Sequence, residues 1–492
     1  MGKRLALVGL AFLLPHCADA YTGAPLGSDG PGGGSVDGGA GGASSVRLVL
    51  EPVPDIIVDA GASVAVPITI TRNGVTGPVV VAVTGLPAGV DAPEVTVAES
   101  SASLTVSVAK GSSFPPAMVT LTATSGAESV SRKTTLLLRG KPGSMDESFG
   151  VEGVVANVLG ASRGAASDLA FRPDGSYVIL ANGAESAFLA PVPREGGVAS
   201  DVLPLPFAVA GALAAEPGGA VVVGGRDAKE PDTMVLRRFR PADLAADEAF
   251  GSAGRTVLGK SGVGGVGDLL FQNGRFLAFH DGTGPAVSAV TTAGALDTGW
   301  GSAGTARTTG MDALSLVPYG TGQVAFSFDT AAYGYATSVV TAAGTASTRG
   351  LVEAAQGGYD PAQGPRGAGS ATTACLPVAD RSGGYGFLLS TGAMNVVRTV
   401  PVDVTSPGLA AVLPADGKVV LVFAPLRRIA LGRFDARTGS RDPTFGATGL
   451  VGVPIEDVSS VRIYLQPDGR LVGFANVETA KVPAVSMFRV WL

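Results

Sequence analysis

The sequence predicts an all-β protein in which a β-sandwich is followed by a β-propeller, and three observations lead to this fold class. A signature of one Asp, one aromatic residue and two Gly recurs at multiples of about 50 residues, the period of propellers and other repeat arrays. Short apolar runs alternate with turns in a chain that contains 72 Gly, which is typical of short strands and tight turns. Charged residues make up only 15% of the chain, and no long amphipathic helix pattern accompanies them.

The composition narrows the classes of function. The formal net charge is −6 and no basic cluster exceeds two neighbouring Arg. A nucleic-acid partner is therefore not expected, because such proteins gather many Lys and Arg on one face. The chain has two His and two Cys, too few for most metal centres and nucleophilic catalytic arrangements. We expect no metal ion, no cofactor and no catalytic residues.

Residues 1–20 read as an export signal, with a basic start and an apolar stretch too short to span a bilayer. Two cleavage sites compete. Ala18-Asp19-Ala20 fits ordinary signal peptidase, whereas the segment that ends in Cys17 resembles a bacterial lipobox, in which Cys17 carries the lipid. Residues 21–45 form a flexible tether rich in Gly and Ser. The sequence predicts an exported bacterial protein, either an outer-membrane-anchored lipoprotein or a secreted one, whose sole membrane contact is a lipid on Cys17.

Residues 46–140 form the predicted sandwich. In Val66–Thr71 and Leu104–Val108, apolar residues occupy every second position, which places one face inward and one outward. About seven such runs favour an immunoglobulin-like β-sandwich. Without the paired Cys and core Trp of antibody domains, it is similar to the disulfide-free Ig-like modules of bacterial secreted and surface proteins. We expect a spacer rather than a ligand-binding module.

Residues 145–492 form the predicted propeller and contain the signature in four copies. The Asp, aromatic residue and first Gly of the copies are Asp146, Phe149 and Gly150; Asp247, Phe250 and Gly251; Asp297, Trp300 and Gly301; and Asp442, Phe445 and Gly446. We expect the Asp to accept N–H bonds in a turn, the aromatic residue to fill the gap between blades, and the Gly to adopt positive φ. An enzyme needs each catalytic residue in one place only, whereas these residues recur in several repeat units. The recurrence therefore indicates a structural role.

A second landmark is a hairpin, in which two apolar strands flank a polar turn that contains Gly. It occurs seven times, with turns at residues 172–176, 216–219, 272–275, 320–323, 381–384, 414–418 and 466–470. A third strand follows each hairpin, and a fourth follows the signature. Four short strands in about 50 residues make one propeller blade, so the sequence predicts seven blades.

The signature and the hairpin together resemble the delta-60 repeat of large bacterial extracellular proteins. The matching positions are Leu296-Asp297 with Trp300, Gly301 and Gly304, the turn Gln466–Arg470, and the pair Arg433-Phe434. The resemblance covers residues 145–492, but three units lack the signature, those that begin near Gly197, Ser347 and Met394. It implies a secreted, propeller-like unit, and the family carries no established catalytic residues.

Few residues are candidates for chemistry. His280 is the one His that follows the predicted signal, and without a Gly-x-Ser-x-Gly elbow it reads as a strand-end residue. Cys375 reads as a buried strand thiol. Two carboxylate pairs, Asp227 with Glu230 and Glu456 with Asp457, would hold a cation or act as acid and base only if they converged at the ring centre. Solvated loop residues are the expected alternative.

Three functions fit the sequence. The first is a non-enzymatic exported protein whose propeller presents a binding face to an unknown extracellular protein or glycan, through loops such as Asn182–Ser186, Gly225–Thr233 and Tyr359–Gly369. The second is a carbohydrate-active hydrolase or lyase that uses carboxylates from different blades near the axis. The third is a purely structural surface protein. An axial channel lined by acids would favour the second over the others.

Overall fold

The computed structural model describes residues 48–492, apart from residues 161–163, 185, 262–264, 283, 311, 330–333, 354–365, 371, 380–384, 392–393, 401–407, 415 and 479–482. The predicted export signal, Cys17 and the tether lie outside the described residues. The described chain is all-β, as predicted, and its one named helix is a 3-10 turn at Pro425–Arg427. In this part of the chain, no helix has the length and apolar character needed to cross a membrane.

Two sheets at the start of the described chain share one hydrophobic core. One contains, in spatial order, β1 (Leu48–Leu50), β3 (Ser63–Arg72), β7 (Ser101–Val108) and β5 (Val90–Asp91). The other contains β2 (Ile56–Val58), β9 (Glu128–Leu138), β8 (Ala117–Ser125), β4 (Val79–Thr84) and β6 (Val95–Val97). In β3, Val66, Ile68 and Ile70 are buried and alternate with exposed residues. They pack with Val119 and Leu121 of β8, so the inner faces of both sheets form one core.

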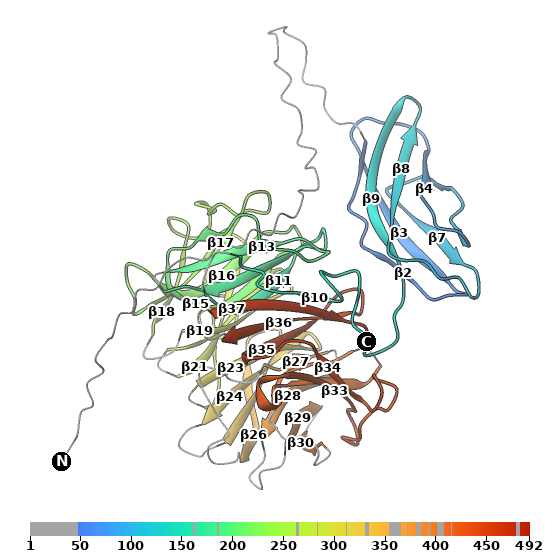
Figure 1. Ribbon diagram of the computed structural model, residues 1–492. Helices are drawn as coiled ribbons and strands as arrows, with labels where there is room; N and C mark the ends of the chain where they lie inside the picture. The colour runs from blue at the N-terminus through green and yellow to red at the C-terminus, as the bar shows by residue number, and fades with distance from the viewer. Residues whose placement is uncertain are drawn as a thin grey trace, which may run out of the picture. The chain divides into compact units, whose positions relative to one another are not determined.

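After residue 145, the described strands form seven four-stranded antiparallel sheets, which follow one another in Figure 1 from green to red. In chain order, the first three are β11 (Ala165–Phe171), β12 (Tyr177–Asn182), β13 (Ala187–Val192) and β14 (Leu203–Pro204); β15 (Phe207–Ala215), β16 (Val221–Asp227), β17 (Thr233–Phe239) and β18 (Thr256–Lys260); and β19 (Val266–Gln272), β20 (Arg275–Asp281), β21 (Pro285–Thr291) and β22 (Thr305–Arg307).

The next three sheets are β23 (Asp312–Tyr319), β24 (Gly322–Asp329), β25 (Gly334–Val340) and β26 (Ala346–Glu353); β27 (Ala368–Gly369), β28 (Thr373–Ala379), β29 (Tyr385–Thr391) and β30 (Met394–Thr399); and β31 (Gly408–Val412), β32 (Lys418–Phe423), β33 (Ile429–Asp435) and β34 (Leu450–Val453). Each predicted hairpin corresponds to two paired antiparallel strands. The turn of the fifth hairpin lies among the residues that are not described.

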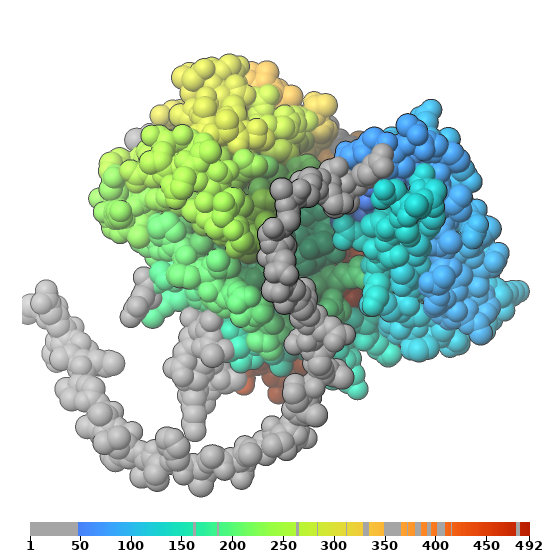
Figure 2. All heavy atoms as spheres, turned by 90° about the horizontal axis from the view of Figure 1, so that it is seen from above, coloured from blue at the N-terminus to red at the C-terminus, as the bar shows by residue number. Residues whose placement is uncertain are grey.

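The seventh sheet joins the two ends of the array. It contains β35 (Val458–Leu465), β36 (Leu471–Glu478) and β37 (Pro483–Val490), and its outer strand is β10 (Val154–Val155). Val154 pairs with Phe488 across β10 and β37. The innermost strands also contact one another in succession, and β11 contacts β36 of the last sheet. The seven sheets therefore close into a propeller-like ring, and Figure 2 shows one face on which they succeed one another from green through yellow to orange.

The signature aromatic residues lie between neighbouring sheets. Phe149, Phe250, Trp300 and Phe445 are all buried. Phe149 packs with residues of the first and seventh sheets, and Phe250 with residues of the second and third. The first Gly of every signature has a φ between +58° and +64°, a region that side chains with a Cβ rarely adopt. Each signature is therefore a tight turn that delivers an aromatic side chain into the joint between two sheets.

Two details of the strand order differ from the simplest expectation. The strand that follows a signature joins the sheet of the preceding hairpin, as β18 does by pairing with β17, so sequence units and sheets are offset by one strand. In the fifth sheet, β27 pairs with β28 on the inner side. The hairpin of β28 and β29 consequently occupies the second and third places of that sheet rather than the first and second.

Candidate axial binding site

The innermost strands carry a repeated irregularity. The pairing register shifts directly before Asp168 in β11, Asp268 in β19 and Ser315 in β23. Such β-bulges bend a strand and change the direction of a side chain. Here they fall in the innermost strands of the first, third and fourth sheets, so each one presents its following residue at the inner edge of the ring.

These residues meet in a cavity of about 170 Å³. Its charged and hydroxyl-bearing lining residues come from five sheets: Asp168 on β11, Asp268 on β19, Ser315 on β23, Arg366 directly before β27, and Arg462 and Tyr464 on β35. The sheets that contribute include the first, third and fifth, which are not neighbours in the ring. A single cavity can be reached from all of them only near the axis.

The Asp268 carboxylate is held by three neighbours. Its Oδ2 lies 3.1 Å from Nη1 of Arg366 and accepts a hydrogen bond from the Ser315 hydroxyl at 3.1 Å. The same oxygen accepts the backbone N–H of Leu316 at 2.8 Å. Arg366 also donates to the backbone carbonyl of Leu314 at 3.1 Å. Asp268 and Arg366 thus neutralise each other and tie β19 to the two sheets that follow it.

Asp168 occupies the corresponding place in β11, but it forms no ion pair with any basic residue that the structure describes. Its Oδ1 accepts the Tyr464 hydroxyl at 2.8 Å, and its Oδ2 accepts the backbone N–H of Leu213 at 2.8 Å. Burial raises the pKa of the Asp168 carboxyl above its ordinary value, although the charges of Arg462 and Arg366 oppose the shift. The carboxylate therefore links the first sheet to its neighbours on both sides.

Arg462 differs from every other charged residue of this cavity. Within the described residues, no hydrogen bond or ion pair holds its guanidinium. Burial, together with the nearby charge of Arg366, lowers its pKa. Arg462 also lines a second cavity of about 310 Å³, whose polar wall includes Asn182, Asn476 and Ser460. Arg462 is thus the described residue that lines both axial cavities.

Two asparagine side chains form matching links between sheets beside this second cavity. Asn182, at the end of β12, accepts the N–H of Ala210 at 2.9 Å and donates to its carbonyl at 2.8 Å. Asn476, on β36, makes the same pair of bonds with Ala166 at 2.7 and 2.9 Å. The first link joins the first sheet to the second, and the second link joins the seventh sheet to the first. The same pair of Asn hydrogen bonds therefore joins two successive sheets and also joins the last sheet to the first.

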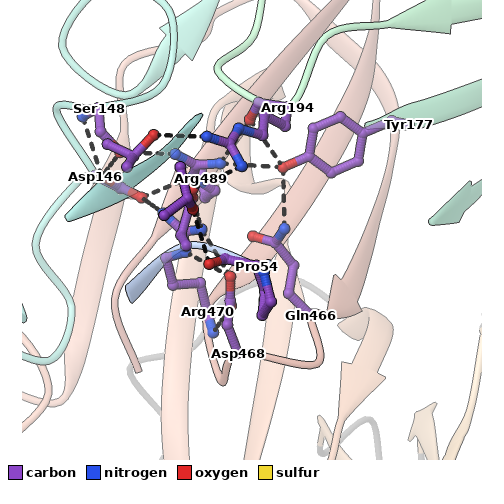
Figure 3. Close-up of polar contacts among 12 residues, drawn as sticks. Pro54, Asp146, Ser148, Tyr177, Arg194, Gln466, Asp468, Arg470 and Arg489 are labelled. Carbon is purple, nitrogen blue, oxygen red and sulfur yellow. Dashed lines mark hydrogen bonds and ion pairs between the residues drawn. The ribbon is translucent and has the colours of Figure 1, made fainter. Parts of the chain in front are cut away.

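The first signature Asp lies in a different polar cluster, shown in Figure 3. The Oδ2 atom of Asp146 is 2.7 Å from both Nη1 of Arg470 and Nε of Arg489. Its Oδ1 accepts the backbone N–H of Ser148 at 3.0 Å. Arg489 also donates to the hydroxyl of buried Tyr177 at 3.1 Å and lies over the Phe149 ring.

Burial by itself would raise the pKa of Asp146, but Arg489, Arg470 and the hydrogen bonds from Ser148 outweigh it and lower that pKa. Arg470 also reaches Asp55, in the segment before β2, with Nη2 and Oδ2 2.8 Å apart. Both carboxylate oxygens of Asp146 are paired within the fold. The signature Asp is accordingly a structural ion-pair residue, and no part of it is left for a ligand.

None of the four carboxylates that the sequence singled out, Asp227, Glu230, Glu456 and Asp457, lines either axial cavity. Asp227 is buried and its Oδ2 lies 2.8 Å from Arg237 and 2.9 Å from Arg255. Glu230 also binds Arg255, at 3.2 Å. Exposed Glu456 pairs with Arg428 at 2.7 Å. In the described part of the chain, no group of three or more His, Cys, Asp or Glu is placed to hold a metal ion.

His280 and Cys375 are both buried. Nε2 of His280 lies 2.9 Å from the hydroxyl of Ser288, beside a cavity of about 630 Å³. A catalytic triad needs a carboxylate at Nδ1, and that atom has no hydrogen-bond partner among the described residues. Burial, then the charge of Arg307, lowers the pKa of His280 to about 4. Burial raises the pKa of the Cys375 thiol, so neither group is prepared for nucleophilic chemistry.

Asn182 and Arg366 lie in loops that the sequence proposed for binding. Asp168, Asp268 and Arg462 were not predicted, although a signal was present for two of them. Asp168 and Arg462 each stand seven residues before the Gly of a hairpin turn, Gly175 and Gly469. Ala410 holds the same place before Gly417 in the sixth sheet. A charge inside an otherwise apolar strand, at a place where another copy carries Ala, marks a position that faces something other than the core.

No protein-family model matches the chain, and no curated protein matches it. Among solved structures, a quinonprotein alcohol dehydrogenase-like protein from Bacteroides thetaiotaomicron is similar at 10% identity, with a TM-score of 0.39, over 82% of this chain and 96% of the other. Virginiamycin B lyase from Staphylococcus aureus is similar at 10% identity and a TM-score of 0.45, over 69% and 99% of the two chains. YCF48 bound to a D1 peptide gives 12% identity and a TM-score of 0.42, over 72% and 98%. Likeness this weak assigns no activity or ligand to this chain.

Proposed function

We propose that the chain is a non-enzymatic exported protein whose propeller binds an extracellular ligand at its axis. In this proposal the sheets of residues 48–138 are an immunoglobulin-like sandwich that acts as a spacer. The seven sheets that follow are the blades of a delta-60-like propeller. Their four-stranded order and the pairing of β10 with β37 support the seven-bladed interpretation.

The observation that carries the binding function is the cavity of about 310 Å³, whose lining comes from three sheets and is largely polar. Ser167 lies on β11, Leu409 on β31, and Arg462 on β35. A concave site with several convergent polar groups on a rigid scaffold is the usual form of a small-ligand site. Strands paired on a closed ring hold such groups in fixed positions, which reduces the ordering cost of binding.

Export rests on residues 1–20 and on the tether that follows them. Mass spectrometry of the mature N-terminus in a bacterial host separates the two routes. A lipid on Cys17 indicates an outer-membrane lipoprotein, and an unmodified terminus after Ala20 indicates secretion. Recovery of a chain that still begins at Met1 would contradict export.

Ligand binding is tested by a thermal-shift screen of the full chain against extracellular sugars, glycans, organic acids and peptides. A ligand that binds only the native state raises the melting temperature. The variant Ala165→Trp fills the cavity wall without removing a hydrogen bond of the ring, and we expect it to abolish the shift. Val257→Trp, on exposed β18 outside the cavity, is the matched control and should keep it. A shift that is equal in both variants would place the ligand elsewhere.

A carboxylate-dependent hydrolase or lyase is the second candidate, because Asp168 and Asp268 come from different sheets and line one cavity. Their oxygens, however, already accept hydrogen bonds from Tyr464, Leu213, Leu316 and Arg366. An acid or base must keep a lone pair within reach of the substrate. The occupied oxygens favour the binding function over catalysis.

A further inference from the structure

The position of Arg462 can be compared directly between repeats. Seven residues before the turn Gly, the second sheet has Ala212 and the sixth has Ala410. Both alanines are buried in sheets of the same architecture. The fold therefore does not need a charged side chain at this place, and the Arg in β35 calls for another explanation.

The guanidinium of Arg462 has five N–H donors and no acceptor among the described residues. The carboxylates nearest to it are committed elsewhere. Asp268 is paired with Arg366, and Asp168 is bonded to Tyr464 and Leu213. Arg462 is only partly exposed, and a guanidinium drawn from bulk water loses hydration that no described acceptor replaces, at a cost in free energy. A bound molecule that brings acceptor oxygens into the cavity would remove that cost.

We propose that Arg462 recognises the carboxylate group of a small polar acid held in the axial cavity of about 310 Å³. This inference rests on the proposed function and names its ligand class. The planar guanidinium fork matches a carboxylate through two parallel hydrogen bonds. Ser167, Ser459 and Ser460 on the same wall offer hydroxyl groups to the polar remainder of the ligand. The amides of Asn182 and Asn476 stay bonded within the ring.

The lining also selects against other ligands. Among the described residues, no aromatic side chain lines this cavity, whereas sugars and nucleobases are usually held by stacking on aromatic faces. Asp168 and Asp268 lie beside the guanidinium and carry negative charge. A dianionic phosphate would meet stronger repulsion there than a single carboxylate does. A compact monocarboxylate with hydroxyl or amide groups satisfies both conditions.

The site also predicts a pH dependence. The charged groups around Arg462 are Asp168, Asp268 and Arg366, and Glu478, which is paired with Arg427, lines the same cavity. Burial raises the pKa of Asp168 above its ordinary value. As pH falls through the raised pKa of Asp168, this carboxylate becomes neutral and its repulsion of the ligand is lost. Binding should therefore become tighter on acidification until the ligand itself is protonated.

The test is isothermal titration calorimetry of the full chain with lactate, glycerate and glucuronate, each paired with its neutral amide, and with glycerol phosphate. We expect at least one carboxylate to bind and its amide to bind at least tenfold more weakly, which is about 1.4 kcal/mol. Arg462→Gln should cause a loss of at least tenfold, and Arg462→Lys should restore part of it. Arg428→Gln, at an exposed ion pair with Glu456, is the matched control and should bind as the native protein does.

The outcomes separate this inference from the function on which it rests. A neutral sugar or peptide that binds in the cavity, is blocked by Ala165→Trp and is indifferent to Arg462→Gln would overturn the carboxylate assignment and leave axial binding intact. Preference for glycerol phosphate over glycerate would overturn it as well. If no compound of either screen binds the native chain, the proposed function fails together with the inference.

Discussion

Arg489 and Asp146, which are 343 residues apart in the sequence, form an Arg–Asp ion pair that other repeats form between residues nine apart. Nε of Arg489 donates to Oδ2 of Asp146 at 2.7 Å. In the sixth sheet, Arg433 and Asp442, nine residues apart, make the same bond at 2.8 Å. The Asp of the first signature thus serves the last sheet. The ring closes because the first signature turn, which contains Asp146, and the last strand, β37, which contains Arg489, together complete one repeat.

This closure predicts that Asp146→Asn is strongly destabilising. The substitution leaves the buried guanidinium groups of Arg470 and Arg489 without their shared carboxylate, a loss of about 3–5 kcal/mol in the free energy of unfolding. Asp297→Asn is the matched control, because its ion pair with Arg275 is partly exposed and is worth about 1 kcal/mol or less. Urea unfolding of both variants measures the difference, and equal costs would contradict the closure.

The asparagine links make a local prediction. Asn476→Ala should increase the hydrogen exchange of β11, where Ala166 loses its partner, and Asn182→Ala should increase that of β15, where Ala210 does. Each variant should lose about 1–3 kcal/mol, because backbone groups are left unpaired. Peptide-resolved exchange mass spectrometry measures both. Exchange that rises in the same strands for both variants would show that the links do not act separately.

The pKa of buried His280 predicts how stability depends on pH. Burial and Arg307 lower this pKa from 6.5 to about 4 in the folded protein. The unfolded chain therefore binds the proton first, so His280 contributes stability that is present above pH 6.5 and is lost as pH falls toward 4. His280→Gln should flatten the stability profile in that window. An imidazole NMR signal that titrates near pH 6.5 would contradict the burial.

The unpartnered state of Arg462 predicts an unusual gain in stability. Arg462→Met keeps the length of the side chain and removes a charge that no described residue pairs. In the absence of ligand, this variant should be at least as stable as the native protein, and up to about 1–2 kcal/mol more stable. Arg433→Met, which breaks a buried ion pair with Asp442, should instead be clearly destabilised. Loss of stability in Arg462→Met would show that its guanidinium has a structural partner.

The repeated parts of the fold could be predicted from the sequence because they are local. Hairpin turns, alternating strands and the signature around Phe250 depend on residues that are close together in the chain. Ring closure could not be predicted in the same way, since nothing near Asp146 shows that its partners are Arg470 and Arg489. The inner strand β27 shows no hairpin pattern in the sequence. Its place is defined only by its pairing with β28 in the folded sheet.

The candidate site was less predictable than the fold. The loops proposed as binding segments contributed Asn182 and residues 366–369 to the axial cavities, but the lining is mostly strand. Asp168, Arg366 and Arg462 come together through β-bulges and through contacts between distant sheets. Sequence spacing alone does not encode which of seven equivalent positions face one another across a ring.

The most direct test of the account is a disulfide across the closing pair. Val154 on β10 and Phe488 on β37 are partners in the register, within the distance that a disulfide spans. In Val154→Cys/Phe488→Cys, mild oxidation should link the two Cys, and peptide mass spectrometry should identify the cross-linked pair. Val154→Cys/Val257→Cys, with its second Cys on β18, should stay unlinked. Absence of the bond in the first variant, or equal linking in both, would contradict a closed ring.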